Sequence, residues 1–103
     1  MTQASTVVLG FSGALTIREA EEVYARLRDA LRSSERIEID CAGVTEADIT
    51  FIQLILAARL SAAAAAKTLT LTGPAQGVMR DALAVAGLLD GPHGPFWTEG
   101  RLA

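Results

Sequence analysis

Residues 37–60 read IEIDCAGVTEADITFIQLILAARL, and this segment indicates the architecture of the whole chain. It begins with alternating apolar and acidic residues, which is typical of a strand with one side in solvent. It ends in a long apolar run at helical spacing, and the residues CAGVTEAD in between predict a connecting loop. A strand that leads into a buried helix is typical of an α/β fold, in which the two kinds of element alternate.

The flanking segments continue this alternation. TVVLGF is a β-branched, apolar run, the Ser-Gly pair after it signals a turn, and TIRE at 16–19 matches a capping box at the start of a helix. The expected strands cover residues 6–11, 14–16, 37–40 and 67–73, and the expected helices cover about 17–31, 48–65 and 75–86. We therefore expect an α/β fold with a small mixed curved β-sheet of about four strands and with helices packed mainly on one side.

The length of 103 residues suits one domain, which we place at residues 1–90. Gly87 and the leucine after it are typical of a left-handed helix stop with an apolar contact. Residues 91–103 are rich in Gly and Pro and are expected to form a C-terminal tail. Phe96 and Trp97 in this tail are expected to pack either back onto the domain or onto a second copy.

Half of the residues are hydrophobic and a fifth are charged, which is enough apolar content to bury a core. The net charge of −3 argues against nucleic acid or an anionic membrane as the main partner, because both attract basic patches. The chain has no apolar run of about 18 residues that would predict a transmembrane helix, and its N-terminus lacks the pattern of a signal peptide. Cys41 is the only cysteine, which fits a reducing compartment, so we expect a cytoplasmic protein.

The helix expected over 48–65 has two different sides. At 100° per residue, one sector holds Phe51, Ile55, Ala58 and Ala62. The apolar positions that widen this sector are Ile49, Ile52, Leu56, Leu60 and Ala63. The remaining side carries Thr50, Gln53, Ala57 and Ser61. Small side chains let another backbone come close, so this strip is either a docking surface or an ordinary solvent-exposed helix surface.

Polar residues crowd the start of the same helix, namely Thr45, Glu46, Asp48 and Thr50. Either Thr45 or Asp48 caps the helix, and in both cases a carboxylate near the positive end of the helix dipole contributes about 0.3–1 kcal/mol. The Thr50 hydroxyl is expected in the first turn, on the exposed side. A phosphate there would add a charge of about −1.5 to −2 to a surface that faces a partner. Thr50 is therefore our candidate phosphorylation site.

A catalytic site needs several chemical groups that converge, and the sequence offers few. His93 is the only histidine, and a single histidine with a single cysteine makes no zinc-type ligand set. No sequence motif marks a base for the Cys41 thiol, and no Gly-rich phosphate-binding loop occurs. We expect a protein that is not an enzyme and that binds no metal and no cofactor.

The chain resembles the STAS domain family, named for sulphate transporters and anti-sigma factor antagonists. The resemblance covers about residues 6–90 and rests on the order of elements, on IEIDCAGVTEAD before an apolar helix, and on the closing segment PAQGVMRDALAVAGLLD. In the family's bacterial antagonists, an Asp-Ser-Ser/Thr-Gly-apolar motif starts the second helix. Asp48 and Thr50 match this motif, whereas Ile49 stands at the position of the phosphorylated serine and Phe51 replaces the glycine.

The resemblance implies a regulatory protein-binding module similar to an anti-sigma factor antagonist. Its partner would be an anti-sigma factor that is also a serine kinase, or a chemotaxis or two-component protein. The implied docking residues are Thr45, Glu46, Asp48, Thr50, Gln53, Ala57 and Ser61. Ile49 favours an alternative, a constitutive STAS subunit of a larger assembly such as a lipid-transport ATPase. Two further alternatives are a small ligand in the core, such as a nucleotide or lipid tail, and a homodimer.

Overall fold

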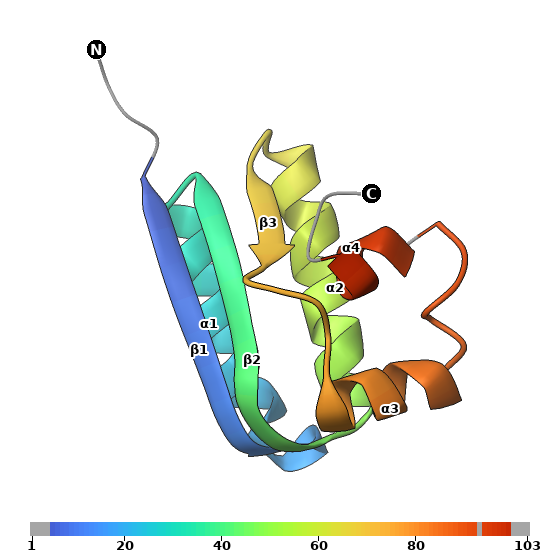
Figure 1. Cartoon of the computed structure of the whole chain (residues 1–103). Helices are drawn as coiled ribbons and strands as arrows, with labels where there is room; N and C mark the ends of the chain where they lie inside the picture. The colour runs from blue at the N-terminus through green and yellow to red at the C-terminus, as the bar shows by residue number, and fades with distance from the viewer. Residues whose placement is uncertain (1–4, 93, 100–103) are drawn as a thin grey trace.

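A three-stranded sheet with its helices on one side forms the body of the protein, as the computed structural model in Figure 1 shows. The structure describes residues 5–92 and 94–99. The predictions that concern His93 and the two ends of the chain, residues 1–4 and 100–103, therefore fall outside the described residues.

The sheet consists of β1 (Thr6–Leu15), β2 (Arg36–Ala47) and β3 (Thr68–Leu71), in that spatial order, and both strand pairs are parallel. The crossovers between them are α1 (Ala20–Ser33) and α2 (Ile49–Ala64). Because the strand order follows the chain order and such crossovers share one hand, both helices fall on the same face of the sheet. The two helices also contact each other. The predicted α/β class, with helices on one side of a small sheet, is confirmed.

The sheet differs from the prediction in strand number and direction. The described residues form three strands instead of about four, and the sheet is parallel instead of mixed. The Ser-Gly pair at 12–13 does not turn the chain back, because β1 continues through it to Leu15. Gly13 adopts a φ of 78°, and the register with β2 shifts on both sides of it. A glycine that signals a turn in the sequence thus serves a β-bulge within one long strand.

The predicted loop CAGVTEAD is also mostly strand, since β2 runs on to Ala47. Gly43 allows β2 to continue beside β1 at this point, because the register places Gly43 next to Ser12. A Cβ atom at position 43 would lie 2.9 Å from the Ser12 Cβ, closer than real Cβ contacts come. The glycine therefore permits the close approach of two strands, in a segment that the sequence predicted to be a connecting loop.

The helix ends follow the predicted signals. A 3₁₀ turn, η1 (Ile17–Glu19), precedes α1, and the predicted capping box is present, with the Thr16 backbone N donating to Glu19 Oε1 at 2.9 Å. α3 (Gly77–Val85) is capped at Ala86 and followed by Gly87, whose φ is 73°. The next amide, that of Leu88, donates to the Leu83 carbonyl at 2.9 Å, which confirms the left-handed stop.

The core lies between the sheet and the helices. The strands contribute Ile37, Ile39 and Leu69 to it. The α2 residues predicted to face inward, Phe51, Ile55, Ala58 and Ala62, are all buried, as is Ile52. The apolar positions predicted to widen this buried sector are only partly buried, because Ile49, Leu60 and Ala63 are exposed. A sheet of three strands covers only a narrow sector of the helix.

The last described element, α4 (Gly94–Glu99), packs back onto the domain, the first of the two arrangements expected for Phe96 and Trp97. Both side chains are 0% exposed. The Trp97 carbonyl accepts a hydrogen bond from the Ala75 amide at 2.8 Å, and the Arg59 guanidinium lies 4.6 Å from the Phe96 ring centroid. The division at residue 90 stays a prediction, but residues beyond it share the core.

Removing a core aromatic ring from α4 tests this packing. We expect Phe96→Ala to lower the free energy of unfolding by about 3–5 kcal/mol, as for other buried aromatic rings. Urea unfolding followed by circular dichroism measures the change. Val85→Ala serves as a control because Val85 is 91% exposed, and it should change the stability by less than about 0.5 kcal/mol. Equal stability of Phe96→Ala and the control would contradict the packing of α4.

Candidate functional site

The amino end of α2 is held by the Asp48 carboxylate, which makes three hydrogen bonds. Its Oδ1 accepts from the backbone amides of Thr50 at 3.0 Å and Phe51 at 3.3 Å, so Asp48, not Thr45, caps the helix. Its Oδ2 accepts from the Ile17 amide at 2.9 Å. One side chain therefore fixes the start of α2 against the start of η1.

Exposed apolar side chains surround this junction. Ile17, whose amide bonds to Asp48, is 69% exposed, and Ile49, which follows the cap, is 46% exposed. Val85 on α3 is 91% exposed. Single exposed apolar residues are common, but Ile49 and Val85 line opposite walls of one groove, which is typical of an interaction surface.

That groove lies between the amino end of α2 and α3 and has a volume of about 680 Å³. One wall consists of Thr45, Glu46, Ala47, Asp48 and Ile49, and the other consists of Val78, Asp81, Ala82, Val85 and Ala86. Sequence reasoning missed the α3 wall. Its valines and alanines have the spacing of an ordinary core helix, and only contact with the end of β2 turns one side of α3 into a groove wall.

The predicted site residues separate into two groups. The structure brings Thr45, Glu46 and Asp48 together along the groove. Gln53, Ala57 and Ser61 instead follow one another along the exposed side of α2. Thr50 lies between the two groups and is half-buried, where the sequence predicted an exposed side chain.

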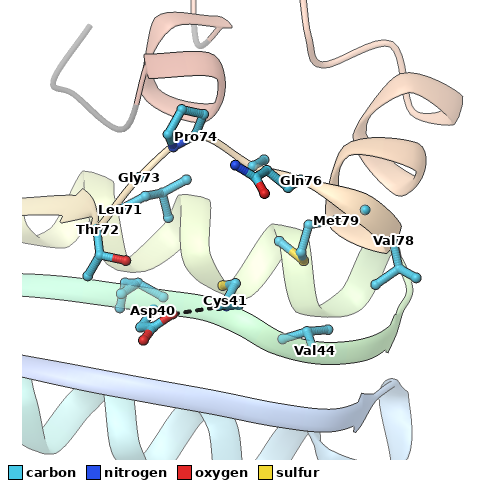
Figure 2. Close-up of a pocket in the computed structure, with 14 residues that line it drawn as sticks. Asp40, Cys41, Val44, Leu71, Thr72, Gly73, Pro74, Gln76, Val78 and Met79 are labelled. Carbon is cyan, nitrogen blue, oxygen red and sulfur yellow. Dashed lines mark hydrogen bonds between the residues drawn. The ribbon is translucent and has the colours of Figure 1, made fainter.

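A second cavity, of about 380 Å³, opens between β2 and the segment that joins β3 to α3. Figure 2 shows that Cys41 on β2 and Met79 on α3 point into it from opposite sides. The Asp40 carboxylate at its edge is already engaged, since its Oδ1 accepts from the Ala42 amide at 2.9 Å. The size is in the range of small-ligand pockets, but the lining brings no pair of charged groups together.

The Cys41 thiol is held in its neutral form. Burial of the thiol, and to a lesser extent the negative charge of Asp40, raise the pKa of Cys41 from 9.0 to about 12. A thiol attacks as its thiolate, so this environment suppresses nucleophilic chemistry. Within residues 5–92 and 94–99, no group of three or more His, Cys, Asp or Glu side chains is placed to hold a metal ion. No helix in the described part of the chain is long and apolar enough to cross a membrane.

Comparison with known proteins agrees with the fold described above. The family model described as "Mlab, STAS domain" matches residues 2–91. The chain belongs to the STAS domain family. The resemblance seen in the sequence is thereby confirmed. A comparison with curated proteins gave no match.

Several solved structures share the STAS fold. The phosphorylated form of the Bacillus cell fate determinant SpoIIAA is 22% identical with a TM-score of 0.66, and the match covers 93% of this chain and 83% of that one. The unphosphorylated anti-sigma factor antagonist SpoIIAA is 21% identical with a TM-score of 0.64, over 82% and 77% of the two chains. A sulfate transporter family protein from Wolinella succinogenes is 14% identical with a TM-score of 0.63, over 82% and 68%.

Substitution of Asp48 tests its role at the junction. We expect Asp48→Ala to lower the free energy of unfolding by about 1–3 kcal/mol, because the helix loses its cap and Ile17 loses a hydrogen-bond acceptor. Asp48→Asn should cost less, because an amide oxygen still caps the helix. Chemical denaturation measures both, with exposed Asp81→Ala as the control. A loss no greater than that of the control would show that the three hydrogen bonds do not stabilise the fold.

The raised pKa of Cys41 predicts slow reaction of its thiol. At pH 8 the native thiol should react with iodoacetamide at least about ten-fold more slowly than the unfolded chain, because burial keeps it protonated. Stability should fall as the pH rises from 9 toward 12, because the unfolded thiol ionises first, and Cys41→Ala should reduce this fall. Mass spectrometry of alkylated protein follows the reaction. Equal rates in the native and denatured chain would contradict the shift.

Proposed function

We propose that this protein is a non-enzymatic cytoplasmic regulatory module that docks a signalling protein at the amino end of α2. The observation that carries this proposal is the pair of exposed apolar side chains, Ile49 and Val85, on the two walls of a groove whose α2 wall is held by Asp48. Burial of such side chains against a partner would supply the main driving force, at about 25 cal/mol per Å² of apolar surface.

The charge of the groove points to the character of the partner. Glu46 and Asp81 are exposed on its two walls, and its lining residues in the described chain include no lysine or arginine. An acidic rim around an apolar floor complements a partner surface with an apolar anchor flanked by basic residues. Gln53, Ala57 and Ser61 would extend the contact along α2. The likeness to an anti-sigma factor antagonist supports an anti-sigma factor with serine kinase activity as the partner. A chemotaxis or two-component protein is the second candidate.

Regulation of this contact would act through Thr50. Its amide already donates to Asp48, so a phosphate on its hydroxyl would stand in the same turn as that carboxylate. Like charges at that distance repel, and the added charge would change the docking surface without a new fold. Because Thr50 is half-buried, a kinase would need the first turn of α2 to open locally.

The alternative is a constitutive subunit of a larger assembly, such as a lipid-transport ATPase, with no phosphorylation switch. Ile49 favours it, because the exposed position directly after the cap carries no hydroxyl group. The half-burial of Thr50 favours it as well. Incubation with the kinase encoded next to this protein and with ATP, followed by mass spectrometry, separates the two forms. Phosphate on Thr50 supports the regulated module, and its absence from Thr50 and Thr45 supports the constitutive subunit.

Charged substitutions in the groove test the docking site itself. We expect Ile49→Asp and Val85→Asp each to weaken binding of the natural partner by at least about ten-fold, because an unpaired charge would enter an apolar contact. Binding of proteins encoded by the neighbouring genes can be measured by isothermal titration calorimetry. Tyr24→Asp is the matched control, since Tyr24 is an exposed apolar residue on α1. Unchanged affinity of both groove variants would reject this site.

A further inference from the structure

The two edges of the sheet differ in what covers them. At the β3 edge, α4 contacts the strand, and Figure 1 shows it on the side of β3 away from β2. The hydrogen bond from Ala75 to Trp97 fixes α4 there. At the other edge, β1 pairs only with β2 among the described residues. The edge of β1 therefore presents unpaired backbone along a strand of ten residues.

The first half of β1 lacks the features that usually block edge pairing. Proteins protect such edges with charged side chains, prolines or bulges. β1 reads TVVLGFSGAL and has no charge and no proline. Its register shifts begin only after Gly10, so the segment from Thr6 to Gly10 pairs with β2 in regular register. Val8, at the centre of this segment, is 54% exposed.

The backbone direction shows which residues are available for pairing. The Ser5 carbonyl accepts from the Arg36 amide at 3.0 Å, so Ser5 turns its backbone toward β2. Because successive residues of a strand alternate, Val7 and Leu9 also turn toward β2. Thr6, Val8 and Gly10 then turn their N–H and C=O groups toward the open edge.

We propose that a second copy of this chain pairs with this edge, antiparallel and centred on Val8. Val8 would oppose Val8 of the partner subunit, and Thr6 would oppose Gly10 of the partner subunit, each as a hydrogen-bonded pair. The two three-stranded sheets would join into one, and the exposed valines would cover each other across the two-fold axis.

Charges on the neighbouring strand favour this register. Arg36 lies beside Thr6 in the sheet, and Asp40 lies beside Gly10. In the proposed pairing, a row across the joined sheet runs from Arg36 through Thr6 and Gly10 of the partner subunit to Asp40 of the partner subunit. The two-fold axis produces the same row a second time, so each arginine lies in line with a carboxylate. A register in which Thr6 faces Thr6 of the partner subunit would instead align the two arginines. A register centred on Leu9 would align Asp40 with Glu38 of the partner subunit, so both alternatives bring like charges into line. Centring the pairing on Val7 keeps opposite charges in line but loses one of three hydrogen-bonded pairs.

This dimer is independent of the proposed docking site and leaves it free. The Asp48 amide donates to the Leu15 carbonyl, so the amino end of α2 lies at the far end of β1 from the paired segment. Antiparallel pairing would place the two α2 amino ends at opposite ends of the dimer. Because the contact is short, we expect a weak, concentration-dependent dimer.

Sedimentation equilibrium of the full chain over a range of concentrations tests the proposal. We expect the wild type to form a reversible dimer and Val8→Lys to be monomeric, because two lysines would meet at the axis. Tyr24→Lys is the matched control, since Tyr24 is also 54% exposed, and it should dimerise like the wild type. Circular dichroism checks that both variants are folded. A monomeric wild type, or a dimer that Val8→Lys leaves unchanged, would overturn the proposal.

A cross-link tests the register. In a Cys41→Ala background, Val8→Cys should form a disulfide-linked dimer on mild oxidation, because directly opposed residues of a hydrogen-bonded pair lie about 5.5 Å apart at Cα. Tyr24→Cys in the same background should remain unlinked. A dimer that is lost in Val8→Lys but gives no cross-link through Val8→Cys would overturn the two-fold centred on Val8.

Discussion

The three hydrogen bonds to the Asp48 carboxylate are the constraint on which this protein's candidate site depends. They join the start of α2 to the start of η1, two segments that are separated in sequence by a complete helix and strand. A carboxylate can accept several hydrogen bonds at once, and here two satisfy free amides of a helix and one crosses to a neighbouring turn. The groove beside α3 consequently has one wall that Asp48 holds in place, and exposed Ile49 lies in that wall.

Much of the fold could be predicted from local patterns. Apolar spacing identified the buried side of α2, the capping box identified the start of the first helical segment, and Gly87 identified a helix end. These features depend on neighbours within a few residues. The prediction failed at Gly13 and Gly43, where the conformation depends on a strand distant in the sequence. A glycine in a β-bulge and a glycine in a turn look the same until the partner strand is known.

The candidate site was predictable only in part, for the same reason. Thr45, Glu46 and Asp48 were identified because they crowd a helix start, and the structure brings them together. The α3 wall of the groove was missed, because Val78, Ala82 and their neighbours read as a core helix. Which side of a short apolar helix is covered depends on the elements packed around it. Leu60 on α2 and Val85 on α3 are apolar, yet they are 63% and 91% exposed.

The burial of Trp97 gives the protein an internal optical probe. It is the only tryptophan in the chain, and its ring is packed edge-on against Phe96 with centroids 4.9 Å apart. Its indole N–H is buried and meets no acceptor among the described residues, so the ring lies in an apolar medium. Its emission should therefore be at short wavelength when α4 is docked and shift to the red when α4 leaves the sheet edge. Fluorescence can thus follow the release of this one short helix in real time, without any added label.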